Sequence, residues 1–383
     1  QDFRNIGMTL NDKLSYEEWV DVYKKLVFWE LELEKLDDPQ MHEILTMQKA
    51  EANMQYSKFV ENHYLDWING SADAPLFSHE LLKKKVFPLI NNTNPVFFIL
   101  IDNLRYDQWK IINPLISEYF RLEEEETYSS ILPTATQYAR NAIFSGLTPL
   151  DMEKRFPTLW QNDDDEGGKN LHEEAFLEDQ IKRSLRKDCK FSYHKILTFD
   201  QGKDLVDQVN NLMHNEFNAI VFNFVDMLSH ARTDMQMIRE LANDDAAYRS
   251  LTLSWFEHSP LLDLIKKISQ KRVKLIITTD HGTIRVKTPS KVIGDRSTNT
   301  NLRYKQGKNL NYNPKEVFLI KNPHEAKLPK VNISSNYIFA KEDQYFVYQN
   351  NYNQFVNYYN ETFQHGGISM EEMIIPIVTY SAK

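Results

Sequence analysis

Cysteine and glycine are scarce in this sequence. Of its 383 residues, one is cysteine, Cys189, and 11 are glycine. A single cysteine excludes an internal disulfide and fits a reducing compartment such as the cytoplasm. It also excludes a zinc site made of several thiolates. We interpret Cys189 as a small apolar residue rather than a nucleophile.

The sequence also lacks a long apolar run and an excess of positive charge. The apolar run at residues 96–101 is too short to cross a bilayer, and no signal peptide is visible, so we expect no membrane insertion and a cytoplasmic location. The formal net charge of −9 argues against a dedicated DNA-binding protein. Hydrophobic residues make up 42% and charged residues 26%, which is typical of a globular protein.

Residues 1–92 are predicted to be helical. Ser15 and Glu18 form a capping-box pattern ahead of an apolar stripe, and Asp38-Pro39 predicts the start of a second helix. Ser78 is expected to open a third, shorter helix. These helices predict a small bundle that acts as a connector, or alternatively an extension that only packs against the rest of the chain.

Residues 93–383 are predicted to form one catalytic α/β domain. Short apolar runs at 96–101, 219–225 and 273–277 are typical of buried parallel strands, and helical stretches separate them. Residues 373–380 are expected to form a last strand. The fold class is therefore a doubly wound, mostly parallel sheet with helices on both faces.

A carboxylate follows each of the three apolar runs: Asp102, Asp226 and Asp280. The carboxyl ends of parallel strands meet at one edge of a sheet, where open α/β sheets bind ligands. A single aspartate there is more often a helix N-cap. Three together would repel one another, and a multivalent cation removes that conflict.

Three histidines accompany these aspartates. His230 lies four residues after Asp226, His281 follows Asp280, and His365 precedes two glycines near a loop. The pair Asp226 and His230 can arise by chance, and an isolated histidine such as His365 is usually structural, so each is weak alone. Asp280 and His281 could reach one metal only from a turn, which Gly282 would permit. Imidazole and carboxylate ligands together suit Zn²⁺ best, and Mn²⁺ or Fe²⁺ less well. Six ligands exceed one tetrahedral ion and predict two ions, an arrangement that suits phosphoryl transfer.

Thr136 is the candidate nucleophile. Residues 131–135 are predicted to be extended, and a helix is predicted to start near Thr136 and to stop at Gly146. A hydroxyl at a helix N-terminus lies where bound phosphate is favoured. The alternative is that Thr134 or Thr136 only caps the helix.

Together these motifs resemble the alkaline phosphatase superfamily, over residues from about 96 to 380. The segments around residues 101–109 and 131–140 resemble more narrowly the PglZ domain, and the whole chain resembles the PorX-type response regulators, which carry that domain. The resemblance implies that one zinc takes the ligands Asp226, His230 and His365. It implies that the other takes Asp102, Thr136, Asp280 and His281, and that the reaction passes through a phosphothreonine.

The PorX-type resemblance also implies a context and partners. Such regulators control type IX secretion and carry a receiver domain before the helices, so we expect one ahead of Gln1. The expected partners are a second copy of the chain in a homodimer, a sensor kinase, and transcription or secretion components.

Residues 283–310 are strongly basic. They carry a net charge of +6 and are expected to lie in an exposed loop over residues 283–315, beside the metals. Positive charge near Tyr304 suits an oligonucleotide, linear or cyclic, although such a loop is also typical of a solvated surface. The candidate substrate-binding residues are Arg140, Asn141, Arg285, Lys287, Arg296 and Arg303.

Two other functions compete with a phosphodiesterase. The fold can serve as a regulatory binding module for secretion or transcription partners. A sulfatase is disfavoured because its nucleophile is a modified Cys or Ser, which Thr136 does not supply. A monoesterase with a Ser nucleophile and a third Mg²⁺ site has no matching pattern.

Overall fold

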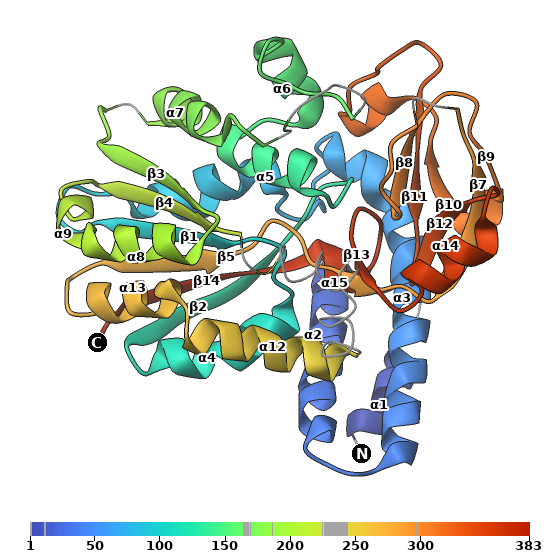
Figure 1. The fold of residues 1–383 in the computed structure, drawn as a ribbon, viewed down its shortest axis with the longest axis horizontal. Coiled ribbons are helices and arrows are strands. Elements are labelled where there is room, and N and C mark those ends of the chain that lie inside the picture. Colours follow the sequence, from blue (N-terminus) through green and yellow to red (C-terminus); the bar gives the residue numbers. More distant parts are fainter. Residues whose placement is uncertain are drawn as a thin grey trace.

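In the computed structural model, a mixed six-stranded sheet forms the centre of the protein (Figure 1). The structure describes all residues except 1, 11–12, 164–167, 169, 186, 224, 226–243 and 296–297. The strand order is β2-β14-β5-β1-β4-β3. Strands β5, β1, β4 and β3 pair in parallel, whereas β14 is antiparallel to both of its neighbours. The strands are β1 (Val96–Ile101), β2 (Phe120–Ser129), β3 (Phe191–Ile196), β4 (Phe217–Phe222), β5 (Lys274–Thr278) and β14 (Ile374–Ala382).

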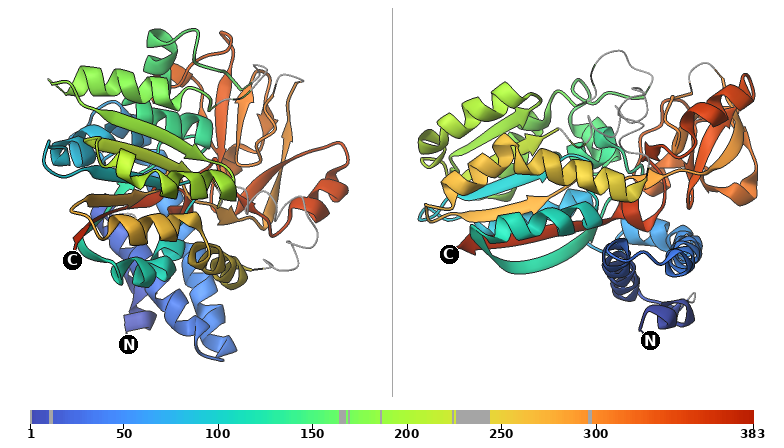
Figure 2. Two further views of the ribbon diagram at one scale, coloured as in Figure 1. Left: turned by 60° about the vertical axis from the view of Figure 1, so that its left-hand side comes forward. Right: turned by 60° about the horizontal axis from the view of Figure 1, so that its bottom comes forward.

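Helices cover both faces of this sheet, as Figures 1 and 2 show. One face carries α4 (Tyr106–Ser117), α8 (Phe199–Asp207), α12 (Asp245–Glu257) and α13 (Pro260–Ile268). The other carries α5 (Thr136–Ser145) and α7 (Glu173–Ser184). Two short helices, α6 (Pro149–Arg155) and α9 (Val209–Leu212), lie at the periphery. The predicted fold class, a doubly wound sheet with helices on both faces, is confirmed.

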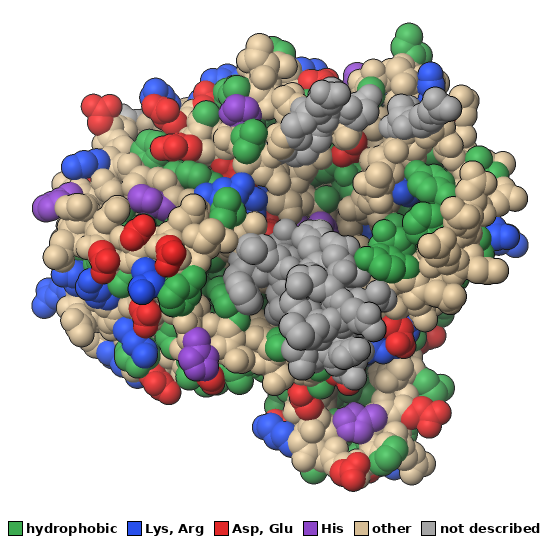
Figure 3. Space-filling model, viewed as in Figure 1, with side chains coloured by type: hydrophobic (Ala, Val, Ile, Leu, Met, Phe, Trp, Pro, Cys, Tyr) green, Lys and Arg blue, Asp and Glu red, His purple; other side chains and the backbone are tan. Residues whose placement is uncertain are grey.

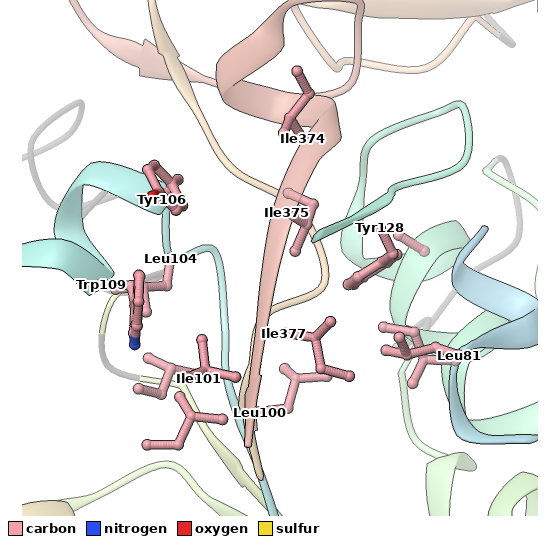
Figure 4. Packing of buried hydrophobic residues seen from close by; sticks show 14 of the residues in the cluster. Leu81, Leu100, Ile101, Leu104, Tyr106, Trp109, Tyr128, Ile374, Ile375 and Ile377 are labelled. Atoms are coloured by element: carbon pink, nitrogen blue, oxygen red, sulfur yellow. The ribbon is translucent and has the colours of Figure 1, made fainter. Parts of the chain in front are cut away.

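The central strands are apolar because they are buried on both faces. All six residues of β1 are buried, and so are all six of β4. Side chains from β1, β14 and α4 pack together in the region drawn in Figure 4, among them Leu100, Ile377 and Trp109. The core therefore fixes the strand ends, and with them the loops that carry Asp102 and Asp280.

The N-terminal helices begin as their capping signals predict. Ser15 and Glu18 make both hydrogen bonds of a capping box at the start of α2 (Tyr16–Glu34), and Asp38 accepts from the Met41 amide at the start of α3 (Pro39–Ile68). A short helix, α1 (Asp2–Thr9), contacts both. The third predicted helix is broken into three short turns, η1 (Ser78–Glu80), η2 (Leu82–Val86) and η3 (Phe87–Leu89). The α2–α3 pair projects from the body of the protein in Figure 1.

A smaller β-rich part follows β5 and carries its own hydrophobic clusters. Its sheets have the orders β10-β11-β8, β12-β7-β9 and β13-β6. The expectation of an exposed loop over residues 283–315 is therefore wrong. Short strands replace it, with alternate residues buried in β7 and all four residues buried in β8, and their frequent polar residues hid the pattern. The elements are β6 (Ile284–Arg285), β7 (Thr288–Ile293), β8 (Tyr304–Gly307), β9 (Asn311–Tyr312), η4 (Pro314–Glu316), β10 (Val317–Ile320), η5 (Pro323–Ala326), β11 (Asn336–Ala340), β12 (Gln344–Tyr348), α14 (Tyr352–Tyr359), β13 (Phe363–Gln364) and α15 (Met370–Met373).

Among the helices that the structure describes, none has the length and apolar character needed to cross a membrane.

Candidate metal centre and nucleophile

The ends of β1 and β5 bring Asp102 and Asp280 together. Because the two strands are parallel neighbours in register, the residues that follow them lie side by side. Both carboxylates are fully buried. The Asn103 amide donates to Oδ1 of Asp280 over 3.0 Å, and the Leu104 amide donates to Oγ1 of Thr279 over 2.9 Å. These bonds lock the two strand-end loops to each other.

His281 completes a group of three residues able to hold a cation. Ligand atoms of Asp102, Asp280 and His281 all lie within 4.8 Å of one another. Nδ1 of His281 lies 3.0 Å from the carbonyl oxygen of Gly282, which only accepts, so Nδ1 carries the proton. Nε2 therefore bears the lone pair that a metal requires. Two carboxylates and one imidazole thus form a buried group whose donor atoms are able to hold a metal ion.

Gly282 allows the turn at Asp280 and His281 because it has no side chain that would meet the backbone of Glu371. A Cβ atom on Gly282 would lie 1.9 Å from the carbonyl oxygen of Glu371, so a larger residue would push the Asp280–His281 turn away from α15. Close packing against Glu371 is therefore the structural reason for a glycine at this position.

Thr136 lies at the same place, on the first turn of α5. Its Oγ1 is 3.1 Å from Nε2 of His281. The N-cap of α5 is Ala135, and no side chain caps the helix. Thr134 does not cap it either, because its hydroxyl donates to the Gly367 carbonyl and accepts from the Gly366 amide, over 2.8 and 3.0 Å. The capping alternative for these two threonines is therefore wrong.

His365 reaches the site from the loop after β13. Its ring stacks on that of His281, with 4.1 Å between ring centroids and 24° between planes. Nδ1 of His365 lies 3.0 Å from the carbonyl oxygen of Thr134, so its Nε2 also bears the lone pair. Asp226 and His230, the other two predicted ligands, lie outside the described residues.

Arg140 supplies the positive charge beside the buried carboxylates. It lies one turn after Thr136, its Nη1 is 3.2 Å from Oδ1 of Asp102, and its Nε donates to Glu173 over 2.6 Å. The Tyr193 hydroxyl donates to the other oxygen of Glu173. No pattern in the sequence pointed to Glu173 or to Tyr193, because each comes from a separate element.

The pKa of Asp280 reflects these charges. Burial alone would raise it, but His281 and Arg140 favour the carboxylate, and the net pKa lies below its usual value. The carboxylate form, which a metal requires, is therefore the form present at neutral pH.

The remaining candidate substrate-binding residues are dispersed. Asn141 is buried within α5, and Arg285 donates to Glu361 over 3.2 Å. Lys287 is exposed at the start of the β-rich part, and Arg296 lies outside the described residues. Arg303 is fully buried, donating to both carboxylate oxygens of Glu372 over 3.0 and 2.7 Å and to the Ile368 carbonyl. These contacts give Arg303 the position of a residue that holds the loop after His365.

Within the described part of residues 283–310, the basic side chains do not all face solvent. Lys305 is buried like Arg303, and burial lowers the pKa of its ammonium group to about 7. On the face drawn in Figure 3, Lys and Arg side chains lie scattered among other types. A count of charges along the sequence therefore overstated the positive field at the site.

A comparison with known protein families shows which family the chain belongs to. The family described as the BREX system PglZ alkaline phosphatase-like domain matches residues 81–380. The chain belongs to this family. Residues 1–68 match the PorX response regulator linker domain, so the resemblance drawn from the motifs is confirmed in both parts. A comparison with curated protein sequences finds no match.

Solved structures with a similar fold are distant in sequence. An inactive threonine-to-alanine variant of murine ectonucleotide pyrophosphatase/phosphodiesterase 5, in complex with AMP, is 11% identical with a TM-score of 0.51, over 75% of this chain and 87% of that one. Phosphonoacetate hydrolase from Sinorhizobium meliloti, in complex with phosphonoformate, is 11% identical with a TM-score of 0.46, over 75% and 90%. The family match and the likeness to the murine phosphodiesterase show that the PglZ domain has the alkaline-phosphatase-like fold. A buried group able to hold a metal ion lies at the edge of its sheet.

Proposed function

We propose that this PglZ domain is a zinc-dependent phosphodiesterase that uses Thr136 as its nucleophile. The observation that carries the proposal is the contact of 3.1 Å between Oγ1 of Thr136 and Nε2 of His281, within the buried group of Asp102, Asp280 and His281. The hydroxyl of Thr136 and the lone pair of Nε2 of His281 therefore face the same point, where a bound zinc ion would favour the alkoxide form of Thr136. The hydroxyl also lies at the positive end of a ten-residue helix, where an anionic phosphate is stabilised.

The proposed ligands of the two ions are those of the superfamily pattern. Asp102, Thr136, Asp280 and His281 would hold one zinc, and Asp226, His230 and His365 the other. Two zinc ions supply Lewis acidity for the attacking and leaving oxygens of a phosphoryl transfer. Mn²⁺ is the alternative ion for the same donors.

The proposed reaction has two steps, the transfer of the phosphoryl group to Thr136 and its release to water. Oγ1 of Thr136 gives up its proton and attacks phosphorus, and the P–O bond to the leaving alcohol breaks as that alcohol takes up a proton. Water then cleaves the phosphothreonine and restores the hydroxyl. Arg140 keeps the Asp102 carboxylate in place during both steps through the contact of 3.2 Å described above.

The proposed substrates are oligonucleotides, linear or cyclic. One structural neighbour is named as a nucleotide pyrophosphatase and phosphodiesterase and was solved with AMP, which supports a nucleotide substrate. Arg285, Lys287 and Arg296 remain candidate contacts for further phosphates, and Asn141 a candidate contact near Thr136.

The proposed biological role is that of the effector part of a two-component response regulator controlling type IX secretion. The match of residues 1–68 to a response-regulator linker domain supports this role. In that setting the helices act as a connector over residues 1–92, the catalytic domain spans residues 93–383, and the chain forms a homodimer in the cytoplasm. A sensor kinase and transcription or secretion components are its proposed partners.

The test is hydrolysis of bis(p-nitrophenyl) phosphate by the zinc-loaded chain. We expect turnover that Thr136→Ala reduces at least about 1,000-fold, since the nucleophile acts together with the metal site. Removal of zinc with a chelator should abolish turnover, and its return should restore it. Thr134→Ser, which keeps the neighbouring hydroxyl and its bonds to Gly366 and Gly367, is a control for the effect of substitution in this segment. Equal rates for Thr136→Ala and the wild type would exclude Thr136 as the nucleophile.

A further inference from the structure

A partly buried ion-pair cluster, in which Glu34 is 38% exposed, connects the N-terminal helices to the catalytic domain. We call it the arginine cluster, and it consists of Glu30 and Glu34 of α2, Arg105 and Asp107 at the start of α4, and Asp245 and Arg249 of α12. Nη1 of Arg249 lies 2.9 Å from Glu30 and 3.0 Å from Asp107, and its Nη2 lies 3.1 Å from Glu34. Arg249 therefore bridges α2 and α4 directly.

Arg105 continues the cluster toward the sheet edge. Its Nε and Nη2 donate to the two carboxylate oxygens of Asp107 over 2.9 and 3.0 Å, and its Nη1 donates to Asp245 over 3.0 Å. Both arginine side chains are at most 4% exposed. Ion pairs that are hydrogen-bonded and removed from water are coupled strongly, so losing one partner disturbs the others.

The electrostatics of the cluster agree with this coupling. Burial alone would raise the pKa of Asp107, but the guanidinium groups of Arg105 and Arg249 hold it well below its usual value. Lys49 of α3 adds a bond of 3.0 Å to the second oxygen of Glu30, so both long N-terminal helices take part.

The cluster is connected to segments that carry proposed zinc ligands. Arg105 lies three residues after Asp102 on the same strand-end loop. Its guanidinium packs on the ring of Phe363, 5.2 Å from the centroid, and Phe363 lies two residues before His365. Phe363 in turn stacks on Tyr248 of α12, with 4.2 Å between ring centroids. In sequence, α12 is the next described helix after Asp226 and His230.

We propose that Glu30 and Glu34 are positioning residues for the metal centre, acting through Arg249, Asp107 and Arg105. The proposal rests on the zinc phosphodiesterase function above and extends it. One end of this continuous set of ion pairs lies on α2, and the other end packs against the loops of Asp102 and His365. The helical region that matches a response-regulator linker therefore influences how firmly the metal ligands are held.

The test compares three glutamates on one helix in the full chain. Glu30→Gln with Glu34→Gln removes the two charges of α2 that contact Arg249. Glu32→Gln removes a charge from α2 that pairs with Lys35 over 3.3 Å at the surface. The measurements are zinc affinity by competition with a chelator, kcat and KM on bis(p-nitrophenyl) phosphate, and the thermal midpoint Tm, which reports folding. All binding is measured well below Tm.

We expect the double variant to lose about 10-fold in zinc affinity or in kcat, at the lower end of the effects seen when groups behind metal ligands are removed, with KM and folding retained. Glu32→Gln should match the wild type. In an Arg249→Met background, the two glutamate substitutions should cause no further loss of zinc affinity or kcat, because Arg249 no longer connects the glutamates to Asp107.

Two outcomes would overturn the inference. Equal zinc affinity and kcat for the double variant and Glu32→Gln would show that the cluster only holds the two parts together. Additive losses in the Arg249→Met background would show that the glutamates act by another route. If the wild-type chain binds zinc but hydrolyses no diester, zinc affinity still decides this inference while the proposed function fails. If it binds no zinc, both fail.

Discussion

At the scale of single residues, Arg140 balances two buried carboxylates. Its guanidinium lies between Asp102 and Glu173, and all three side chains are at most 2% exposed. The pKa of Arg140 is raised, because the two carboxylates and Asp280 outweigh the effect of burial. Removing one partner of a buried ion pair leaves an uncompensated charge, which costs about 3–5 kcal/mol.

We therefore expect Arg140→Met to destabilise the metal-free protein by about that amount, and the zinc-loaded protein by less, because zinc also neutralises Asp102. The measurement is the unfolding midpoint in denaturant with chelator and with zinc. Arg155→Met is the matched control, since Arg155 forms an exposed pair with Asp179 over 2.8 Å and should change stability by at most about 1 kcal/mol. An equal loss with and without zinc would contradict this account of Arg140.

At the scale of elements, Thr134 connects the segment before α5 to the loop of His365 through hydrogen bonds. The Thr134 hydroxyl bonds the backbone of both Gly366 and Gly367, and the Thr134 carbonyl holds Nδ1 of His365. Gly366 has φ +131°, a conformation that favours glycine, and a Cβ there would lie 2.7 Å from Asn301 and Tyr304. The loop of His365 therefore depends on backbone contacts to the segment that leads into α5.

We expect Thr134→Val, which keeps the shape but removes the hydroxyl, to lower kcat on bis(p-nitrophenyl) phosphate about 10-fold while Thr136 stays in place. The buried Gly366 amide would lose its partner, which costs about 1–3 kcal/mol and favours movement of the loop. Thr134→Ser keeps the hydroxyl and should retain activity close to that of the wild type. If the valine and serine variants behave alike, the hydroxyl does not position His365.

Elements that sequence signals specify locally were predicted well. The capping box at Ser15, the N-cap at Asp38 and the stop of α5 at Gly146 were each confirmed, because short-range hydrogen bonds set them. The prediction that Asp102 and Asp280 lie close together was also confirmed, because residues that follow two parallel strands in register are necessarily neighbours. The small sheets after β5 were missed, because two-residue strands such as β6 and β9 form through pairing with distant segments.

Contacts between side chains from separate elements could not be predicted. Arg303 contributed to a positive charge count, yet its partner Glu372 lies 69 residues further along the chain. The bridge from Arg249 to Glu30 spans 219 residues. Neither pair leaves a periodic or spaced pattern, so only the tertiary structure shows which charges are solvated and which are internal.

At the scale of the whole molecule, the hydrophobic core and the metal site are separate sources of stability. The strands of the central sheet are buried over their full length in β1 and β4, and this burial does not involve the carboxylates at the strand ends. The site also carries part of its own charge compensation, since Arg140 faces Asp102 at 3.2 Å. Zinc should therefore shape the site without being required for the fold.

We accordingly expect removal of zinc with a chelator to abolish diester hydrolysis reversibly while the far-ultraviolet circular dichroism spectrum stays the same. Bound zinc should still raise the free energy of unfolding, by about 2.7 kcal/mol when its concentration is 100 times the dissociation constant of a single site, because only the folded chain presents the complete ligand set. The measurement is Tm at increasing zinc concentration, with Asp102→Asn as the control that weakens the site. Collapse of the secondary structure on removing zinc would instead mean that the ions hold the strand-end loops together, as in domains that fold only around their metal.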